Sequence, residues 1–150
     1  MKTAIEANVR WMLRQDLNEV VDIERESFDF AWDEDDFIQT LKQRNCIGMV
    51  VNDVDRIRGF MVYTLENNYL HILKFAVAPW ARRKGFGTQM VDKLIGKLNQ
   101  QRRQRIVLEV RETNLPAQLF FRAMKFEARE VIRSHYEDTA EDAFQFVYEI

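Results

Sequence analysis

The feature that most constrains the fold is a strand-like run followed by a basic, glycine-containing loop and a helix. Residues 69–78 are rich in β-branched and aromatic side chains and are followed by Pro79, a pattern typical of a strand. Residues 88–101 carry apolar side chains at helical spacing, which predicts an amphipathic helix. The two segments together predict a strand, a loop and a helix in succession.

Similar periodicities predict the other elements of the chain. Helices are expected at residues 16–27, 33–44 and 116–125, and strands at residues 47–51, 58–65, 105–111, 126–133 and 143–150, with a further candidate strand at 7–13. Asn52 and Asp53 predict a hairpin turn, and Asn114 predicts a cap for the last helix. Hairpins at both ends of the chain and alternating elements in its second half predict an α/β (α+β) class with a mixed sheet covered by helices.

Length and composition limit the classes of protein to consider. The chain has 150 residues, 47% of them hydrophobic, which suits one substantial core and predicts a single domain over residues 1–150. With 22 basic and 24 acidic residues the net charge is -2, so we expect no nucleic-acid partner. Cys46 is the only cysteine and there are two histidines, without zinc-binding spacing, so no metal is expected.

The N-terminal residues carry charges and lack the apolar core of a signal peptide. Further along, the sequence has no window that approaches the roughly 20 apolar residues of a membrane span. We therefore expect a cytoplasmic protein without a membrane partner.

The loop at residues 82–87 has the composition of a phosphate-binding site. Three basic residues, Arg82, Arg83 and Lys84, precede Gly85 and Gly87 where the helix is expected to begin. Backbone N–H groups at a helix N-terminus attract anions, and glycine lets an anion approach the backbone closely. The spacing matches neither a Walker loop nor a dinucleotide motif. An ordinary turn with a solvated run of charges is the alternative interpretation.

The loop pattern Arg82-x-x-Gly85-x-Gly87 resembles the acetyl-CoA pyrophosphate loop, Q/R-x-x-G-x-G/A, of the GNAT superfamily. Residues 108–114, L-E-V-R-E-T-N, resemble the L-E-V-R-x-x-N motif of the bacterial ribosomal-protein-alanine N-acetyltransferases within that superfamily. Residues 23–28, 30–32 and 133–136 fit further features of this branch, so the resemblance covers essentially the whole chain. It implies a GNAT-like fold, a central mixed, mostly antiparallel sheet splayed in the middle and flanked by about four helices.

The resemblance also implies what the protein binds and which residues bind it. It implies acetyl-CoA as the co-substrate and a protein or peptide N-terminus as the acceptor, of the ribosomal-protein type, in a monomer or homodimer. The implied cofactor-binding residues are Phe75, Ala76, Val77, Arg82, Arg83, Lys84, Gly85, Phe86, Gly87, Thr88 and Asn114. Phe30 and Trp32 correspond to the wall of the acceptor groove, although core packing explains them equally well.

Glu109 corresponds to the general base of the family, the group that takes a proton from the incoming amine. Its carboxylate interrupts an apolar strand, and burying it costs several kcal/mol unless it is paired or protonated. We therefore expect a raised pKa, which would suit base chemistry. An ion pair with an arginine of a neighbouring strand is the alternative. His71 and His135 show no partner in the sequence and are expected to be structural.

Two positions depart from the family pattern L-Y-x-x-x-G-F. Phe121 stands where the family has its tyrosine general acid, and Tyr136 is a candidate acid or peptide contact, with packing as the alternative. Lys125 replaces the glycine, where a left-handed helix cap is usual, so the turn after that helix is expected either to differ or to carry about 1 kcal/mol of strain. Two other functions stay open, a GNAT enzyme acting on a small amine or a lysine side chain and a non-catalytic acyl-CoA-binding regulatory domain.

Overall fold

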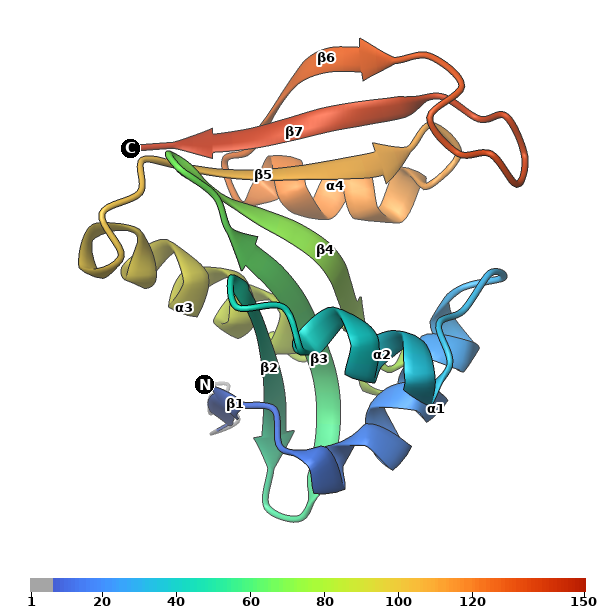
Figure 1. Ribbon diagram of the computed structural model, residues 1–150, viewed down its shortest axis with the longest axis vertical. Coiled ribbons are helices and arrows are strands. Elements are labelled where there is room, and N and C mark those ends of the chain that lie inside the picture. Colours follow the sequence, from blue (N-terminus) through green and yellow to red (C-terminus); the bar gives the residue numbers. More distant parts are fainter. Residues whose placement is uncertain (1–6) are drawn as a thin grey trace. The chain divides into compact units, whose positions relative to one another are not determined.

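The computed structural model describes residues 7–150, which form two compact units (Figure 1). The described part of unit 1 consists of residues 7–65 and 72–97, and unit 2 consists of residues 66–71 and 98–150. The single domain expected over residues 1–150 stays a prediction.

The seven strands follow the order β1-β2-β3-β4-β5-β7-β6. Their bounds are β1 Asn8–Trp11, β2 Cys46–Asp53, β3 Arg56–Leu65, β4 Tyr69–Val77, β5 Arg105–Arg111, β6 Glu127–Ile132 and β7 Ala143–Glu149. In unit 2, β5 pairs with β4 in parallel from Tyr69 to His71 and with β7 in antiparallel. The pairs β1–β2, β2–β3 and β6–β7 are also antiparallel. These pairings confirm the predicted mixed, mostly antiparallel sheet.

Within residues 7–150, four α-helices accompany the strands, in agreement with the about four that were predicted. They are α1 Leu17–Ser27, α2 Glu34–Leu41, α3 Phe86–Gln100 and α4 Leu115–Ala123, with short 3-10 helices η1 Arg14–Asp16 and η2 Pro79–Ala81. The side chain of Asp33 caps α2 by accepting the N–H of Asp36. No helix within residues 7–150 is long and apolar enough to cross a membrane.

The turn between β2 and β3 lies two residues later than predicted. Asn52 and Asp53 are the last residues of β2, and the turn consists of residues 54–55. Val54 adopts a φ of 47° there, which is unusual for a β-branched residue. The Arg58 guanidinium binds the carboxylate of Asp53, which holds Asp53 in the ladder beside β3.

A glycine of β3 allows a close approach to the end of β4 within unit 1. A Cβ atom at Gly59 would lie 2.7 Å from the carbonyl oxygen of Ala76 and 3.1 Å from Cε of Met90. Close by, the N–H of Ala78 donates to the carbonyl oxygen of Arg58 at 2.8 Å. These contacts fix the end of β4, the segment expected to bind the cofactor.

In unit 2, aromatic side chains connect the end of α4 to the sheet. The ring of Phe121 lies edge-on to that of Phe126 at 5.2 Å, and Phe126 in turn lies 5.5 Å from the ring of Tyr148. Leu108 is buried, and Glu109 points to the opposite face of β5, because successive strand residues alternate between faces. The face that carries Glu109 is where a site can form.

Candidate active site

The predicted phosphate loop lies between η2 and α3 in unit 1. Helix α3 begins at Phe86, so Phe86, Gly87 and Thr88 form its first turn. Gly85 precedes them with a φ of 87°, and its carbonyl oxygen accepts the N–H of Gln89 at 3.0 Å. Because the first N–H groups of a helix have no intrahelical acceptor, the backbone at residues 86–88 can bind an anion.

The basic side chains of this loop are exposed. Arg83 has a φ of 64°, and Arg82 folds back so that its Nε donates to the carbonyl oxygen of Val77 at 3.2 Å. Phe86 is buried, which leaves only its backbone N–H for a ligand. A basic loop at a helix N-terminus matches the predicted chemistry, and cofactor binding by these residues stays a prediction.

Glu109 is bound by a histidine and not by an arginine. Its Oε1 lies 2.7 Å from Nε2 of His71 on β4, and its Oε2 accepts a hydrogen bond from Nε2 of Gln145 at 3.3 Å. The alternative of an arginine partner is therefore wrong, and His71, for which the sequence shows no partner for metal or triad chemistry, has a carboxylate partner. The parallel register of β4 and β5, which pairs His71 with Val107, brings His71 within reach of Glu109.

The expected rise in the pKa of Glu109 is also wrong. Burial alone would raise this pKa, but the hydrogen bond and charge of His71, the hydrogen bond from Gln145 and the charge of His135 together lower it. The hydrogen bond to Glu109 raises the pKa of His71, against the effect of burial. Both directions favour an ion pair between a carboxylate and an imidazolium.

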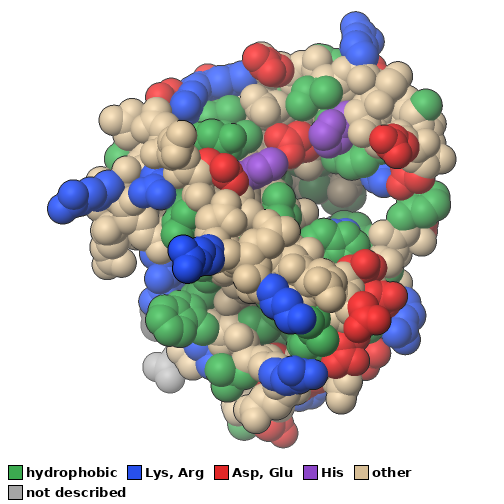
Figure 2. Space-filling model, in the orientation of Figure 1, with side chains coloured by type: hydrophobic (Ala, Val, Ile, Leu, Met, Phe, Trp, Pro, Cys, Tyr) green, Lys and Arg blue, Asp and Glu red, His purple; other side chains and the backbone are tan. Residues whose placement is uncertain are grey.

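A pocket of about 230 Å³ opens beside this pair within unit 2. Its lining consists of Tyr69, His71, Arg105, Val107, Glu109, Gln145 and Val147. Figure 2 shows histidine side chains next to acidic side chains on one face of the molecule. The pair between Glu109 and His71 is thus reachable from solvent.

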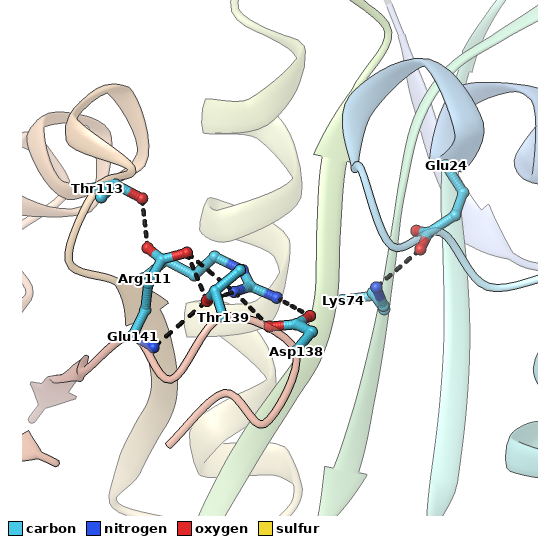
Figure 3. Close-up of polar contacts among 7 residues, drawn as sticks. All are labelled: Glu24, Lys74, Arg111, Thr113, Asp138, Thr139 and Glu141. Atoms are coloured by element: carbon cyan, nitrogen blue, oxygen red, sulfur yellow. Dashed lines mark hydrogen bonds and ion pairs between the residues drawn. The ribbon is translucent and has the colours of Figure 1, made fainter. Parts of the chain in front are cut away.

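Tyr136 lies in the loop between β6 and β7, which a polar cluster centred on Arg111 holds in place (Figure 3). The Arg111 guanidinium binds the carboxylate of Asp138 at 2.7 and 3.0 Å and the hydroxyl of Thr139 at 3.2 Å. The same guanidinium carbon lies 3.9 Å from the centre of the Tyr136 ring. Burial raises the pKa of Tyr136, with the charge of Arg111 opposing it, so the phenol stays protonated at neutral pH.

Three positions singled out in the sequence, Asn114, Phe121 and Lys125, lie in or next to α4. Asn114 caps α4 as predicted, accepting the N–H of Ala117 at 3.2 Å, while its contact with a cofactor stays a prediction. Phe121 is buried in aromatic packing, so this position offers no proton donor. Lys125 has a φ of 75°, so of the two alternatives the turn keeps the left-handed conformation instead of differing from it.

Phe30 and Trp32 lie between α1 and α2 in unit 1. The N–H of Trp32 donates to Oε2 of Glu24 at 2.9 Å, and its ring lies edge-on to Phe37 at 5.2 Å. Lys74 binds the same Glu24 oxygen (Figure 3) and lies 4.9 Å from the centre of the Trp32 ring. Trp32 is therefore half-buried and packs against Phe37 and Lys74 of unit 1, whereas Phe30 is exposed. A role in acceptor binding stays a prediction for both.

Sequence reasoning gave His71 only a structural role and missed Gln145 and Lys74. All three are polar residues inside strands, like Glu109, and each binds a carboxylate. A polar residue that interrupts an apolar strand was the signal that supported Glu109 beside the L-E-V-R-E-T-N motif. The same signal applied to every strand would have found them.

Comparison with known proteins agrees with this geometry. The model of the acetyltransferase (GNAT) family matches residues 17–126. A predicted ribosomal protein bS18-alanine N-acetyltransferase of Bacillus subtilis is 27% identical over 144 residues, 95% of this chain and 94% of that protein. An uncharacterized N-acetyltransferase of Methanocaldococcus jannaschii is 30% identical over 142 residues, 93% of this chain and 89% of that protein.

The structural comparison identifies the same fold. The crystal structure of the ribosomal-protein-S18-alanine N-acetyltransferase from Escherichia coli superposes with a TM-score of 0.86 at 22% identity, covering 97% of this chain and 94% of that one. The family match includes the basic loop, Glu109 and Asn114. The chain therefore belongs to the GNAT family and is an N-acetyltransferase.

Proposed function

We propose that the protein transfers the acetyl group of acetyl-CoA to the α-amine of a protein N-terminus, with Glu109 as the proton acceptor. The observation that carries the proposal is the Glu109 carboxylate, ionised and held by two hydrogen bonds beside a solvent-accessible pocket. Its sequence context is the L-E-V-R-E-T-N segment. The relatives from B. subtilis and E. coli are named as N-acetyltransferases of an alanine of a ribosomal protein.

Acetyl-CoA binding is assigned to the residues predicted from the loop and from β4. The N–H groups of residues 86–88 and the side chains of Arg82, Arg83 and Lys84 are suited to the pyrophosphate, because all of them present positive charge or N–H donors. The backbone of Phe75, Ala76 and Val77 and the side chain of Asn114 are assigned to the remainder of the cofactor.

The reaction forms one bond and breaks another. The neutral amine attacks the thioester carbonyl, Glu109 accepts one amine proton, and the carbon–sulfur bond breaks to release the CoA thiolate. Backbone N–H groups of β4 are the proposed donors to the oxyanion. Tyr136, whose phenol stays protonated, is the proposed donor of a proton to the thiolate or a contact of the acceptor.

The direction of the Glu109 pKa favours an α-amine over a lysine. A carboxylate whose pKa is lowered is a weak base. An α-amine has a reference pKa of about 7.7–8.0 and is partly neutral near pH 7, whereas lysine at about 10.4 is almost fully charged. An α-amine therefore requires less of a weak base than a lysine side chain does.

Substitution of Glu109 by glutamine tests this role directly. Glutamine keeps the size of the side chain but cannot take a proton, so we expect kcat to fall by about 100-fold or more with an alanine-starting peptide. CoA release measures the rate, and calorimetry should give an unchanged Kd for acetyl-CoA. A Glu109→Gln enzyme with wild-type kcat would remove Glu109 from the mechanism.

Substitution of Tyr136 by phenylalanine tests the proposed role of the phenol. If the phenol donates a proton, Tyr136→Phe should have a lower kcat and the same affinity for acetyl-CoA.

A panel of acceptors separates the remaining candidates. If only small amines or an internal lysine react, the acceptor is a small amine or a lysine side chain and not a protein N-terminus. Binding of acetyl-CoA without any acetylated product would favour the non-catalytic alternative that Phe121 suggested.

A further inference from the structure

Glu109 does not act alone in this geometry, because a second titratable side chain is fixed against it. We propose that His71 is a positioning residue that orients the Glu109 carboxylate and, through its own protonation, sets how good a base that carboxylate is. The inference rests on the proposed role of Glu109 as proton acceptor.

The contact is short and comes from two regular strands. His71 Nε2 and Glu109 Oε1 lie 2.7 Å apart, the length of a charge-assisted hydrogen bond. The side chains are 27% and 15% exposed, so water screens the pair only partly. Gln145 of β7 holds the other carboxylate oxygen, which leaves Glu109 with little freedom to rotate. A carboxylate fixed on both oxygens points in one direction, as proton transfer requires.

The charge of His71 controls the carboxylate beside it. When His71 is neutral, it donates one hydrogen bond to Glu109 and the carboxylate is free to accept a proton from the amine. When His71 is protonated, its positive charge stabilises the carboxylate further and weakens it as a base. Activity is therefore expected to rise with pH as His71 loses its proton.

Other titratable and charged groups also face this pair. Glu66 precedes β4 and acts on His71 together with Glu109, and His135 acts on Glu109 from the β6–β7 loop. The remaining groups near the pair are Tyr69, Arg105, Arg111 and Tyr136. Among these groups, only His71 and His135 are of a residue type whose ordinary pKa lies near physiological pH.

Two substitutions of His71 separate its charge from its hydrogen bond. Glutamine at position 71 keeps an N–H donor for Glu109 but cannot be protonated, whereas phenylalanine removes the donor while retaining a flat ring. His135→Gln is the matched control, since it removes the other histidine without touching the hydrogen bond to Glu109.

The readout is kcat against pH at saturating acetyl-CoA and peptide. For the wild type we expect an acidic limb with a midpoint above 6.5, the ordinary pKa of histidine. His71→Gln should lose the part of that limb that comes from His71, keep the part that comes from ionisation of the acceptor amine, and equal or exceed the wild-type kcat at about pH 6. His71→Phe should lower kcat by about 10-fold across the pH range with KM for acetyl-CoA unchanged. His135→Gln should keep the limb.

Three results would overturn the proposal. They are an unchanged acidic limb in His71→Gln, wild-type kcat in a folded His71→Phe, and loss of the limb in His135→Gln alone. NMR titration adds a test independent of activity, because the His71 pKa should fall in Glu109→Gln, and a constant value would also contradict the pairing. If the wild type acetylates no peptide, the proposed function fails, and the titration still decides whether the pair exists.

Discussion

Glu24 is a carboxylate with a fully buried side chain, neutralised by Lys74 inside unit 1. The Nζ atom of Lys74 lies 2.7 Å from Oε2 of Glu24, and the same oxygen accepts the N–H of Trp32. Oε1 of Glu24 is buried without a hydrogen-bond partner among the described residues. The Nζ atom of Lys74 also lies 4.4 Å from the centre of the Phe28 ring, so a cation–π interaction stabilises its charge as well.

Lys74→Met should destabilise the protein by about 3 kcal/mol, because it leaves a buried carboxylate without its cation. Urea unfolding measures the loss. The double variant Glu24→Gln with Lys74→Met removes both charges and should recover most of it. If the double variant loses as much stability as Lys74→Met alone, the loss does not come from leaving the Glu24 carboxylate without its cation.

At the scale of elements, α4 ends in a motif that demands a left-handed residue. The N–H of Phe126 donates to the carbonyl oxygen of Phe121 and the N–H of Lys125 to that of Arg122, both at 2.9 Å. With the contact between the Phe121 and Phe126 rings, this is a Schellman cap, in which glycine is the usual residue at the position of Lys125.

Lys125→Gly should stabilise the protein by about 1 kcal/mol, since glycine adopts a φ of this sign without a Cβ clash. Thermal unfolding would show it as a rise in Tm. Lys125→Ala serves as the control, because it removes the same charge and keeps the strained Cβ. An equal gain from alanine would assign the effect to charge instead of backbone conformation.

The junction of β3 with the end of β4 is the second element that a single change should disturb. Gly59→Ala places a Cβ against the carbonyl oxygen of Ala76, which should destabilise the protein by about 1–3 kcal/mol and weaken acetyl-CoA binding. Gly96→Ala is the control, because its Cβ meets nothing within 4 Å and alanine is the better helix former. Equal stability and acetyl-CoA affinity in the two variants would contradict this account of Gly59.

How far the sequence predicts the structure depends on how local the interaction is. The periodicity of residues 105–111 predicts β5 at its observed bounds, and Asn114 predicts the cap of α4, because both signals lie within one element. The turn lies later than predicted because Asp53, a residue type common in turns, is held in β2 by its ion pair with Arg58.

The site itself was predictable only in part. The basic loop and Glu109 carry local motifs, but the contact between His71 and Glu109 joins residues 38 positions apart. It depends on which strands pair and in which register, and the hydrophobic pattern of one strand does not contain that information. The sign of the Glu109 pKa shift followed from the same contact, which is why the expectation based on burial alone was wrong.

At the scale of the whole molecule, the two units carry different parts of the proposed machinery. Unit 1 contains the basic loop and the end of β4, and unit 2 contains Glu109, His71 and Tyr136. The net charge of -2 gives no general attraction for polyanions, so affinity for acetyl-CoA is expected to depend on the local N–H groups and basic side chains of the loop.

The central claim is that the acetyl group goes to a protein N-terminus. The most direct measurement is tandem mass spectrometry of an alanine-starting peptide with one internal lysine, after incubation with acetyl-CoA and either the wild type or Glu109→Gln. We predict that the wild type places the acetyl group on the α-amine and that the variant gives little product in the same time. Acetylation confined to the lysine, or no acetylated peptide at all, would contradict the account.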